Sequence, residues 1–128
     1  MFIKRALESM IKEVSNTYPV LLVTGPRQVG KTTLIEYVAD KTRKYVSLDN
    51  QVARQLAREE PLLFLQRYEP SVIIDEIQYA PELLPYIRLH VDRNKNMGDF
   101  CLTGSFLYFL VLRLFRHLME LFFLKVIL

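Results

Sequence analysis

The chain has 128 residues, which is enough for one domain and too few for two. Its 17 basic residues outnumber the 14 acidic ones only slightly, so charge gives no support for a nucleic-acid partner. A single cysteine, Cys101, excludes an internal disulfide and fits a reducing compartment, and its apolar neighbours predict a buried thiol.

The N-terminal segment, residues 1–16, predicts an amphipathic helix because its apolar residues recur at helical spacing. Its charged residues also interrupt any apolar segment of a signal peptide, so we expect a cytoplasmic protein. The next segment, Val20–Thr24, is a short apolar run rich in β-branched residues, which is typical of a buried parallel strand. A helix is then expected from Thr33 to Ala39, which leaves residues 25–32 between a strand and a helix.

These eight residues fit the pattern G-x-x-x-x-G-K-[ST]. The glycines let the backbone approach a phosphate, the successive N–H groups form an anion nest, and the following helix adds the positive end of its dipole. We expect Lys31 to contact the β- and γ-phosphates and the Thr32 hydroxyl to bind Mg²⁺. The predicted nucleotide-binding residues are Gly25, Pro26, Arg27, Gln28, Val29, Gly30, Lys31, Thr32 and Thr33.

Strands and helices alternate along the rest of the chain up to residue 105. Further strands are predicted at 45–48, 71–74 and 100–103, and helices at 51–59, at 62–68 and from Pro81 onward. This alternation predicts an α/β fold with a parallel sheet.

An acidic pair, Asp75 and Glu76, follows the third predicted strand. Since parallel strands share one carboxyl edge, we expect the pair to lie at the same edge as the phosphate loop. Asp75 is placed to hold Mg²⁺, and Glu76 to orient and deprotonate an attacking water. If the fourth strand lies between the first and third, the hydroxyls of Thr103 and Ser105 face the γ-phosphate and the water. Gln78 is expected to cap the turn after the acids.

Four ordered motifs carry a family resemblance. They are Gly-Pro-Arg-Gln-Val-Gly-Lys-Thr-Thr-Leu (25–34), Ser-Leu-Asp (47–49), Asp-Glu-Ile-Gln (75–78) and Leu-Thr-Gly-Ser (102–105). Together they resemble the Walker A, Walker B and sensor motifs of an AAA+-type P-loop ATPase. The detail is most similar to the prokaryotic AAA-domain "ATP-binding proteins", which usually carry a C-terminal domain of unknown function resembling a nuclease fold.

The resemblance implies a three-layer P-loop NTPase fold of the AAA+/ASCE type, with the strand order 5-1-4-3-2. It implies ATP and Mg²⁺ as ligands, with Thr103 or Ser105 at the sensor position. It also implies function within a larger chain, often as a homo-oligomer, whereas a nucleic-acid partner follows only by family analogy.

The resemblance covers about residues 1–105, the expected ATPase core, and stops at an apolar tail, residues 106–128. We therefore expect the sheet to be incomplete at its last strand. Three interpretations of the tail stay open. In the first, the tail is a buried helix, or a helix plus a strand at 122–127, that closes the sheet beside the first strand. In the second, it contacts a membrane surface or another subunit, and in the third, it is the out-of-frame end of a truncated gene. Charged residues at 113, 116 and 120 argue against a membrane-spanning helix.

The tail bears on activity, because AAA+ enzymes use a later arginine finger, and no arginine after Ser105 has a matching motif. The sequence thus favours an ATP-binding, Mg²⁺-dependent ATPase core with weak hydrolysis. The alternative is a fragment that only binds nucleotide or has no function. A kinase is disfavoured because no arginine-rich lid is present, and a GTPase because Met97 replaces the base-reading acid after residues 94–96.

Overall fold

The computed structural model describes residues 19–24, 43–94, 96–104 and 124–127. The helix predicted at 1–16, the phosphate loop with the helix after it, Ser105, and residues 106–123 and 128 of the tail lie outside this set.

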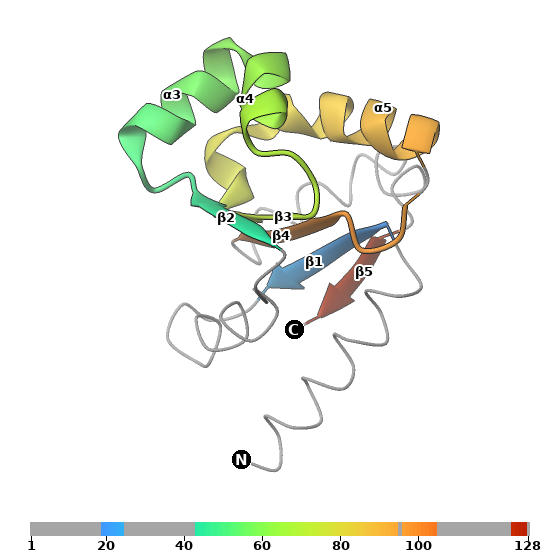
Figure 1. Ribbon diagram of the computed structural model, residues 1–128. Coiled ribbons are helices and arrows are strands. Elements are labelled where there is room, and N and C mark those ends of the chain that lie inside the picture. Colours follow the sequence, from blue (N-terminus) through green and yellow to red (C-terminus); the bar gives the residue numbers. More distant parts are fainter. Residues whose placement is uncertain (1–18, 25–42, 95, 105–123, 128) are drawn as a thin grey trace.

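Five parallel strands of the described chain form one sheet (Figure 1). They are β1 (Val20–Thr24), β2 (Lys44–Ser47), β3 (Val72–Asp75), β4 (Phe100–Gly104) and β5 (Leu124–Ile127). Their spatial order is β2-β3-β4-β1-β5, which read from the opposite edge is the order 5-1-4-3-2. The α/β class, the parallel sheet and the strand order are therefore confirmed.

The fifth strand lies beside β1, with Val20 paired with Leu124 and Val23 with Ile127. The sheet thus has a strand at the position where we expected it to be incomplete. This placement agrees with one of the three interpretations of the tail, in which a strand at 122–127 closes the sheet.

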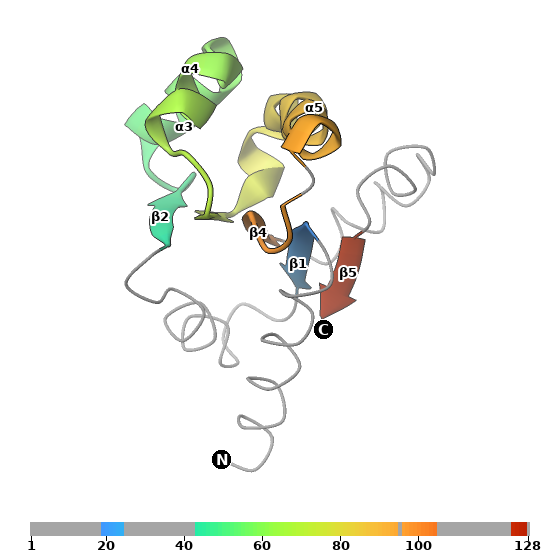
Figure 2. The same ribbon diagram turned by 45° about the vertical axis from the view of Figure 1, so that its right-hand side comes forward.

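The described helices all cover the same face of the sheet (Figures 1 and 2). They are α3 (Gln51–Glu59), α4 (Pro61–Arg67) and α5 (Leu84–Asn94), with the 3₁₀ turns η1 (Ile77–Tyr79) and η2 (Pro81–Leu83) between β3 and α5. Asn50 caps α3, because its side-chain oxygen accepts two backbone N–H groups of the first turn at 2.9 and 3.1 Å. The helix predicted from Pro81 begins instead as a 3₁₀ turn and becomes α-helical at Leu84.

The described apolar side chains of β1, β3 and β4 are buried on both faces of the sheet. The face toward the helices packs against Phe64, Leu83 and Ile87, and it includes Val20, Leu22, Val46, Val72, Ile74, Phe100 and Leu102. Side chains of the opposite face, at Leu21, Ile73 and Cys101, are buried as well. Burial on both faces is why these strands appear in the sequence as continuous apolar runs.

The prediction of a buried thiol at Cys101 is confirmed, since the side chain is free and 1% exposed. Burial raises its pKa to about 12, because a thiolate loses its hydration inside the sheet. None of the helices in the described part of the chain has the length and apolar character needed to cross a lipid bilayer.

Candidate functional site

The predicted catalytic and metal-binding residues of β3 and β4 meet at the carboxyl edge of the sheet. Asp75 is the last residue of β3, Glu76 follows it, and Thr103 lies near the end of β4. β4 lies between β1 and β3, as the predicted role of Thr103 requires. The structure therefore brings together Asp75, Glu76 and Thr103, three residues that the sequence assigned to one site.

Thr103 links the two acidic residues through its hydroxyl. Its side chain is fully buried, and Oγ1 accepts the backbone N–H of Glu76 at 3.1 Å. The same hydroxyl donates to Oδ1 of Asp75. A threonine hydroxyl has one hydrogen to donate and two lone pairs, so both bonds form at once. Thr103 thus fixes the carboxylate of one acid and the backbone of the other.

Asp75 receives a second hydroxyl from the strand on its other side. The phenol of Tyr45, on β2, donates to Oδ2 of Asp75 at 2.9 Å. Burial of the phenol, together with its hydrogen bond to Asp75, raises the pKa of Tyr45 to about 12. The phenol therefore keeps its proton at neutral pH and remains a donor to the carboxylate.

Tyr45 was not predicted as a site residue, because no sequence motif contains it and it precedes Asp75 by 30 residues. A signal exists once the strand order is known. Ser47 pairs with Asp75 in the β2–β3 ladder, and Tyr45 is two residues before Ser47, on the same face of the sheet. A phenol on the strand next to an acid, one pleat away, is within reach of its carboxylate.

Glu76 adopts a backbone conformation that is unfavourable for its residue type. Its φ of 61° and ψ of 51° lie in the left-handed region, and no other described non-glycine residue has a positive φ. Such a conformation costs about 1–3 kcal/mol and is found preferentially at functional sites. Here the Thr103 bond to the Glu76 N–H offsets part of that cost.

The side chain of Glu76 is also held in place. It is 6% exposed, and the side-chain amide of Gln78 donates to Oε2 of Glu76 at 2.8 Å. Gln78 therefore contacts the acid itself, in the turn that we expected it to cap. A buried carboxylate that accepts a hydrogen bond is suited to a defined position beside a substrate.

The donor set fits Mg²⁺ bound with a nucleotide. Within residues 19–24, 43–94, 96–104 and 124–127, no group of three or more His, Cys, Asp or Glu side chains could enclose a metal ion. Mg²⁺ in nucleotide sites needs only one or two carboxylates, because phosphates and water supply the other ligands. Asp75 is half-buried, and its two hydrogen bonds leave lone pairs for a cation.

The remaining predicted site residues, from Gly25 to Thr33 together with Ser105, lie outside the described residues. β1 ends at Thr24, the residue before the G-x-x-x-x-G-K-T pattern, and Thr24 pairs with Gly104 at the end of β4. The strand that leads into the predicted phosphate loop therefore ends next to the strand that carries Thr103.

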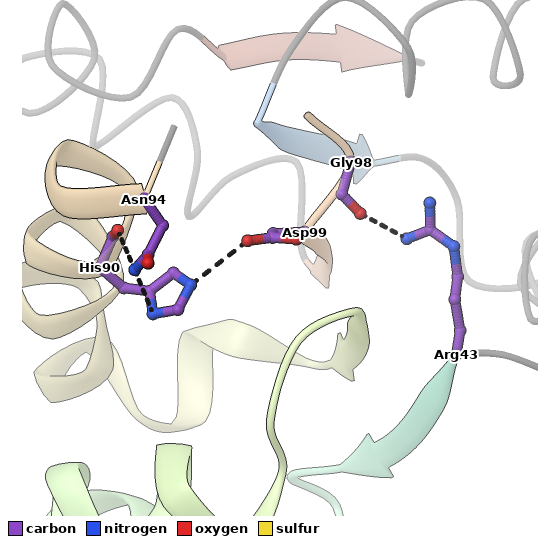
Figure 3. Close-up of polar contacts among 5 residues, drawn as sticks. All are labelled: Arg43, His90, Asn94, Gly98 and Asp99. Carbon is purple, nitrogen blue, oxygen red and sulfur yellow. Dashed lines mark hydrogen bonds and ion pairs between the residues drawn. The ribbon is translucent and has the colours of Figure 1, made fainter. Parts of the chain in front are cut away.

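A second polar cluster lies at the opposite edge of the sheet (Figure 3). Nε2 of His90 lies 3.2 Å from Oδ2 of Asp99, and Asn94 contacts both the ring and the backbone carbonyl of His90. The guanidinium of Arg43 donates to the carbonyl of Gly98 at 2.9 Å. His90 thus joins α5 to Asp99, the residue before β4, and the cluster fixes the amino ends of β2 and β4.

Comparisons with known proteins agree with this geometry. Residues 17–121 match the sequence model of a family described as "AAA domain". The match begins later than the resemblance drawn from the motifs, and it continues past residue 105 into the tail. Two curated relatives, the uncharacterized proteins Rv2008c of Mycobacterium tuberculosis and Mb2031c of Mycobacterium bovis, are each 36% identical to this chain over 104 residues.

Those 104 residues are 80% of this chain but only 23% of each relative, so the chain spans about a quarter of their length. The strand order, the acidic residues joined through Thr103 and the family match all lead to one assignment. The chain belongs to the AAA-domain family of P-loop, ATPase-type nucleotide-binding domains.

Proposed function

We propose that the chain is the ATP-binding, Mg²⁺-dependent hydrolytic core of a larger AAA-type protein. The observation that carries the proposal is the arrangement of Asp75, Glu76 and Thr103 at the carboxyl edge of the sheet, one strand away from the end of β1. Ligands of parallel α/β sheets bind at this edge, where the strand order reverses.

Each residue then has a role that its chemistry allows. Residues 25–33 cradle the phosphates, with Lys31 as the cation and Thr32 and Asp75 as ligands of the metal. A bound Mg²⁺ would neutralise charge on the phosphates. Glu76 orients a water molecule and accepts its proton.

The hydroxyls of Thr103 and Ser105 have separate roles. Thr103 bonds the Asp75 carboxylate and the Glu76 N–H, which supports a role in positioning the two acids. Ser105 keeps the role predicted from the sequence, contact with the γ-phosphate. Both act in concert with the phosphate loop, so we expect losses on mutation to be far from additive.

Nucleotide binding is tested by titrating the full chain with a fluorescent ATP analogue in the presence of Mg²⁺. Lys31→Ala should abolish binding, because the phosphate charge loses its fixed cation. Lys44→Ala, which removes an exposed lysine at the start of β2, is the matched control and should bind as the wild type does. An unchanged affinity in Lys31→Ala would refute the assignment of the loop.

Hydrolysis is tested with Glu76→Gln, which keeps the shape of the side chain and removes the base. The variant should bind ATP normally and lose on the order of 10²–10⁴ in turnover. A variant that releases phosphate at the wild-type rate would exclude Glu76 as the base.

A second candidate, binding without hydrolysis, is favoured by one observation in the sequence. No arginine after Ser105 has a motif matching an arginine finger, and the loss of such a residue costs on the order of 10³–10⁵ in rate.

Phosphate release should therefore be measured at increasing protein concentration. A rate per chain that rises with concentration supports a homo-oligomer in which a neighbouring chain supplies a catalytic group. Multiple turnover at every concentration excludes the binding-only candidate.

A further inference from the structure

We propose that Tyr45 is a positioning residue that orients the metal-binding carboxylate of Asp75. The inference rests on the proposed function and adds to it a residue of β2 that none of the four sequence motifs includes.

The geometry places a donor on each oxygen of one carboxylate. Tyr45 donates to Oδ2 at 2.9 Å and Thr103 donates to Oδ1. The two donors come from β2 and β4, the strands on either side of β3 (Figure 1). They therefore reach Asp75 from opposite sides. A single hydrogen bond leaves a carboxylate free to turn about it, whereas two bonds from opposite sides fix its plane.

The chemistry of Tyr45 suits this purpose. Its phenol carries one O–H, which donates to Oδ2 of the acid at 2.9 Å. A ligand carboxylate is normally held by such a partner, and removing the partner costs about 10–100-fold in metal affinity or activity. The Tyr45 side chain is 49% exposed, so water can replace part of the lost bond, and the lower end of that range is expected.

Because Tyr45 is half-exposed, the effect of removing its hydroxyl can be distinguished from an effect on core packing. A ring that is half in solvent contributes little to the core, and Tyr45→Phe keeps that ring and removes only the hydroxyl. Tyr86→Phe is a matched control, because Tyr86 lies on α5 and borders a cavity of about 650 Å³ that also touches Pro70 and Asp99, at the opposite edge of the sheet.

The experiment measures how much Mg²⁺ the full chain needs to bind a fluorescent ATP analogue. Tyr45→Phe should raise the Mg²⁺ concentration at half-saturation about tenfold and leave nucleotide binding in EDTA unchanged. Tyr86→Phe should behave as the wild type. In the Asp75→Asn background, the Tyr45→Phe change should have no further effect, because the oriented carboxylate is already gone.

The outcomes distinguish this inference from the proposed function. If Tyr45→Phe requires no more Mg²⁺ than the wild type, the inference is wrong and the proposed function stands. If Tyr45→Phe has the same effect in the Asp75→Asn background as in the wild type, Tyr45 acts on another group and the inference is wrong. If the wild-type chain binds no nucleotide, the proposed function fails, and the inference fails with it.

Discussion

Replacing Thr103 by valine tests the link between the two acidic residues in the absence of any ligand. The substitution keeps the volume and branching of the side chain and removes the hydroxyl. Thr103 is fully buried, so no solvent is available to take its place. The backbone N–H of Glu76, now 3.1 Å from that hydroxyl, would lose its acceptor.

The cost follows from the two bonds that are lost. A buried donor left without a partner costs about 1–3 kcal/mol. Asp75 loses one bond as well, but its carboxylate is half-exposed, so water recovers much of that loss and about 0.5–1 kcal/mol remains. The left-handed backbone of Glu76 is held partly by the same bond. Thr103→Val should therefore lower the free energy of unfolding by about 2–4 kcal/mol, a large part of the stability of a single domain.

The comparison with serine sharpens the test. Thr103→Ser keeps the hydroxyl and removes one buried methyl group, which costs about 1 kcal/mol. The expected order of stability is threonine, then serine, then valine, although valine is the most apolar of the three. Apolar burial alone would place valine above serine.

Equilibrium unfolding in urea, followed by far-UV circular dichroism, gives the free energies for the three proteins. Their m-values should agree if the folded and unfolded states are comparable. A valine variant within about 0.5 kcal/mol of the wild type, or more stable than the serine variant, would refute the hydrogen-bonded link through Thr103.

Three further predictions concern other parts of the chain. Gln78→Ala should lower turnover about tenfold with unchanged nucleotide affinity, because Glu76 loses its amide donor. Gln55→Ala removes a similar amide–carboxylate pair on the exposed face of α3 and should match the wild type. Equal turnover in both variants would contradict the role of Gln78. Asn50→Ala should lower the free energy of unfolding by about 1 kcal/mol through loss of the α3 cap, and an unchanged urea midpoint would count against the cap. The Cys101 thiol, with its pKa raised to about 12, should resist thiol reagents in the folded chain and react once urea unfolds it. The contribution of the protonated thiol to the free energy of unfolding should be present below pH 9.0 and be lost as the pH rises toward 12. Cys101→Ala should not show this loss.

β1 and β3 were predictable because each contains a continuous apolar run. A parallel sheet buried on both faces requires such runs, and Val20–Thr24 is predicted with the bounds that the structure has. The helix at 51–59 was predictable for a local reason as well, since Asn50 gives a cap and Pro61 separates it from the next helix. The strand order came from the family resemblance, because single-strand patterns carry no information on neighbours.

The limits of prediction follow from contacts between distant segments. β2 begins and ends one residue earlier than its apolar pattern indicated, because its ladder pairs Lys44 with Val72. The contact between Tyr45 and Asp75 joins two strands through side chains, and no spacing in the sequence encodes it. The His90–Asp99 pair is hidden in the same way, since the end of a helix and the start of a strand meet only in the folded chain.

The position of β4 has a consequence for how the domain acquires its site. β4 pairs with both β1 and β3, so it joins one half of the sheet, β1 with β5, to the other half, β2 with β3. Residues 100–104 leave the ribosome after β1, β2 and β3, yet they must insert between strands already made. Assembly of the centre of the sheet is therefore a long-range step, of the kind that slows folding. Until it occurs, Glu76 lacks its Thr103 acceptor, and we expect the nascent chain to become competent for nucleotide binding only after β4 has docked.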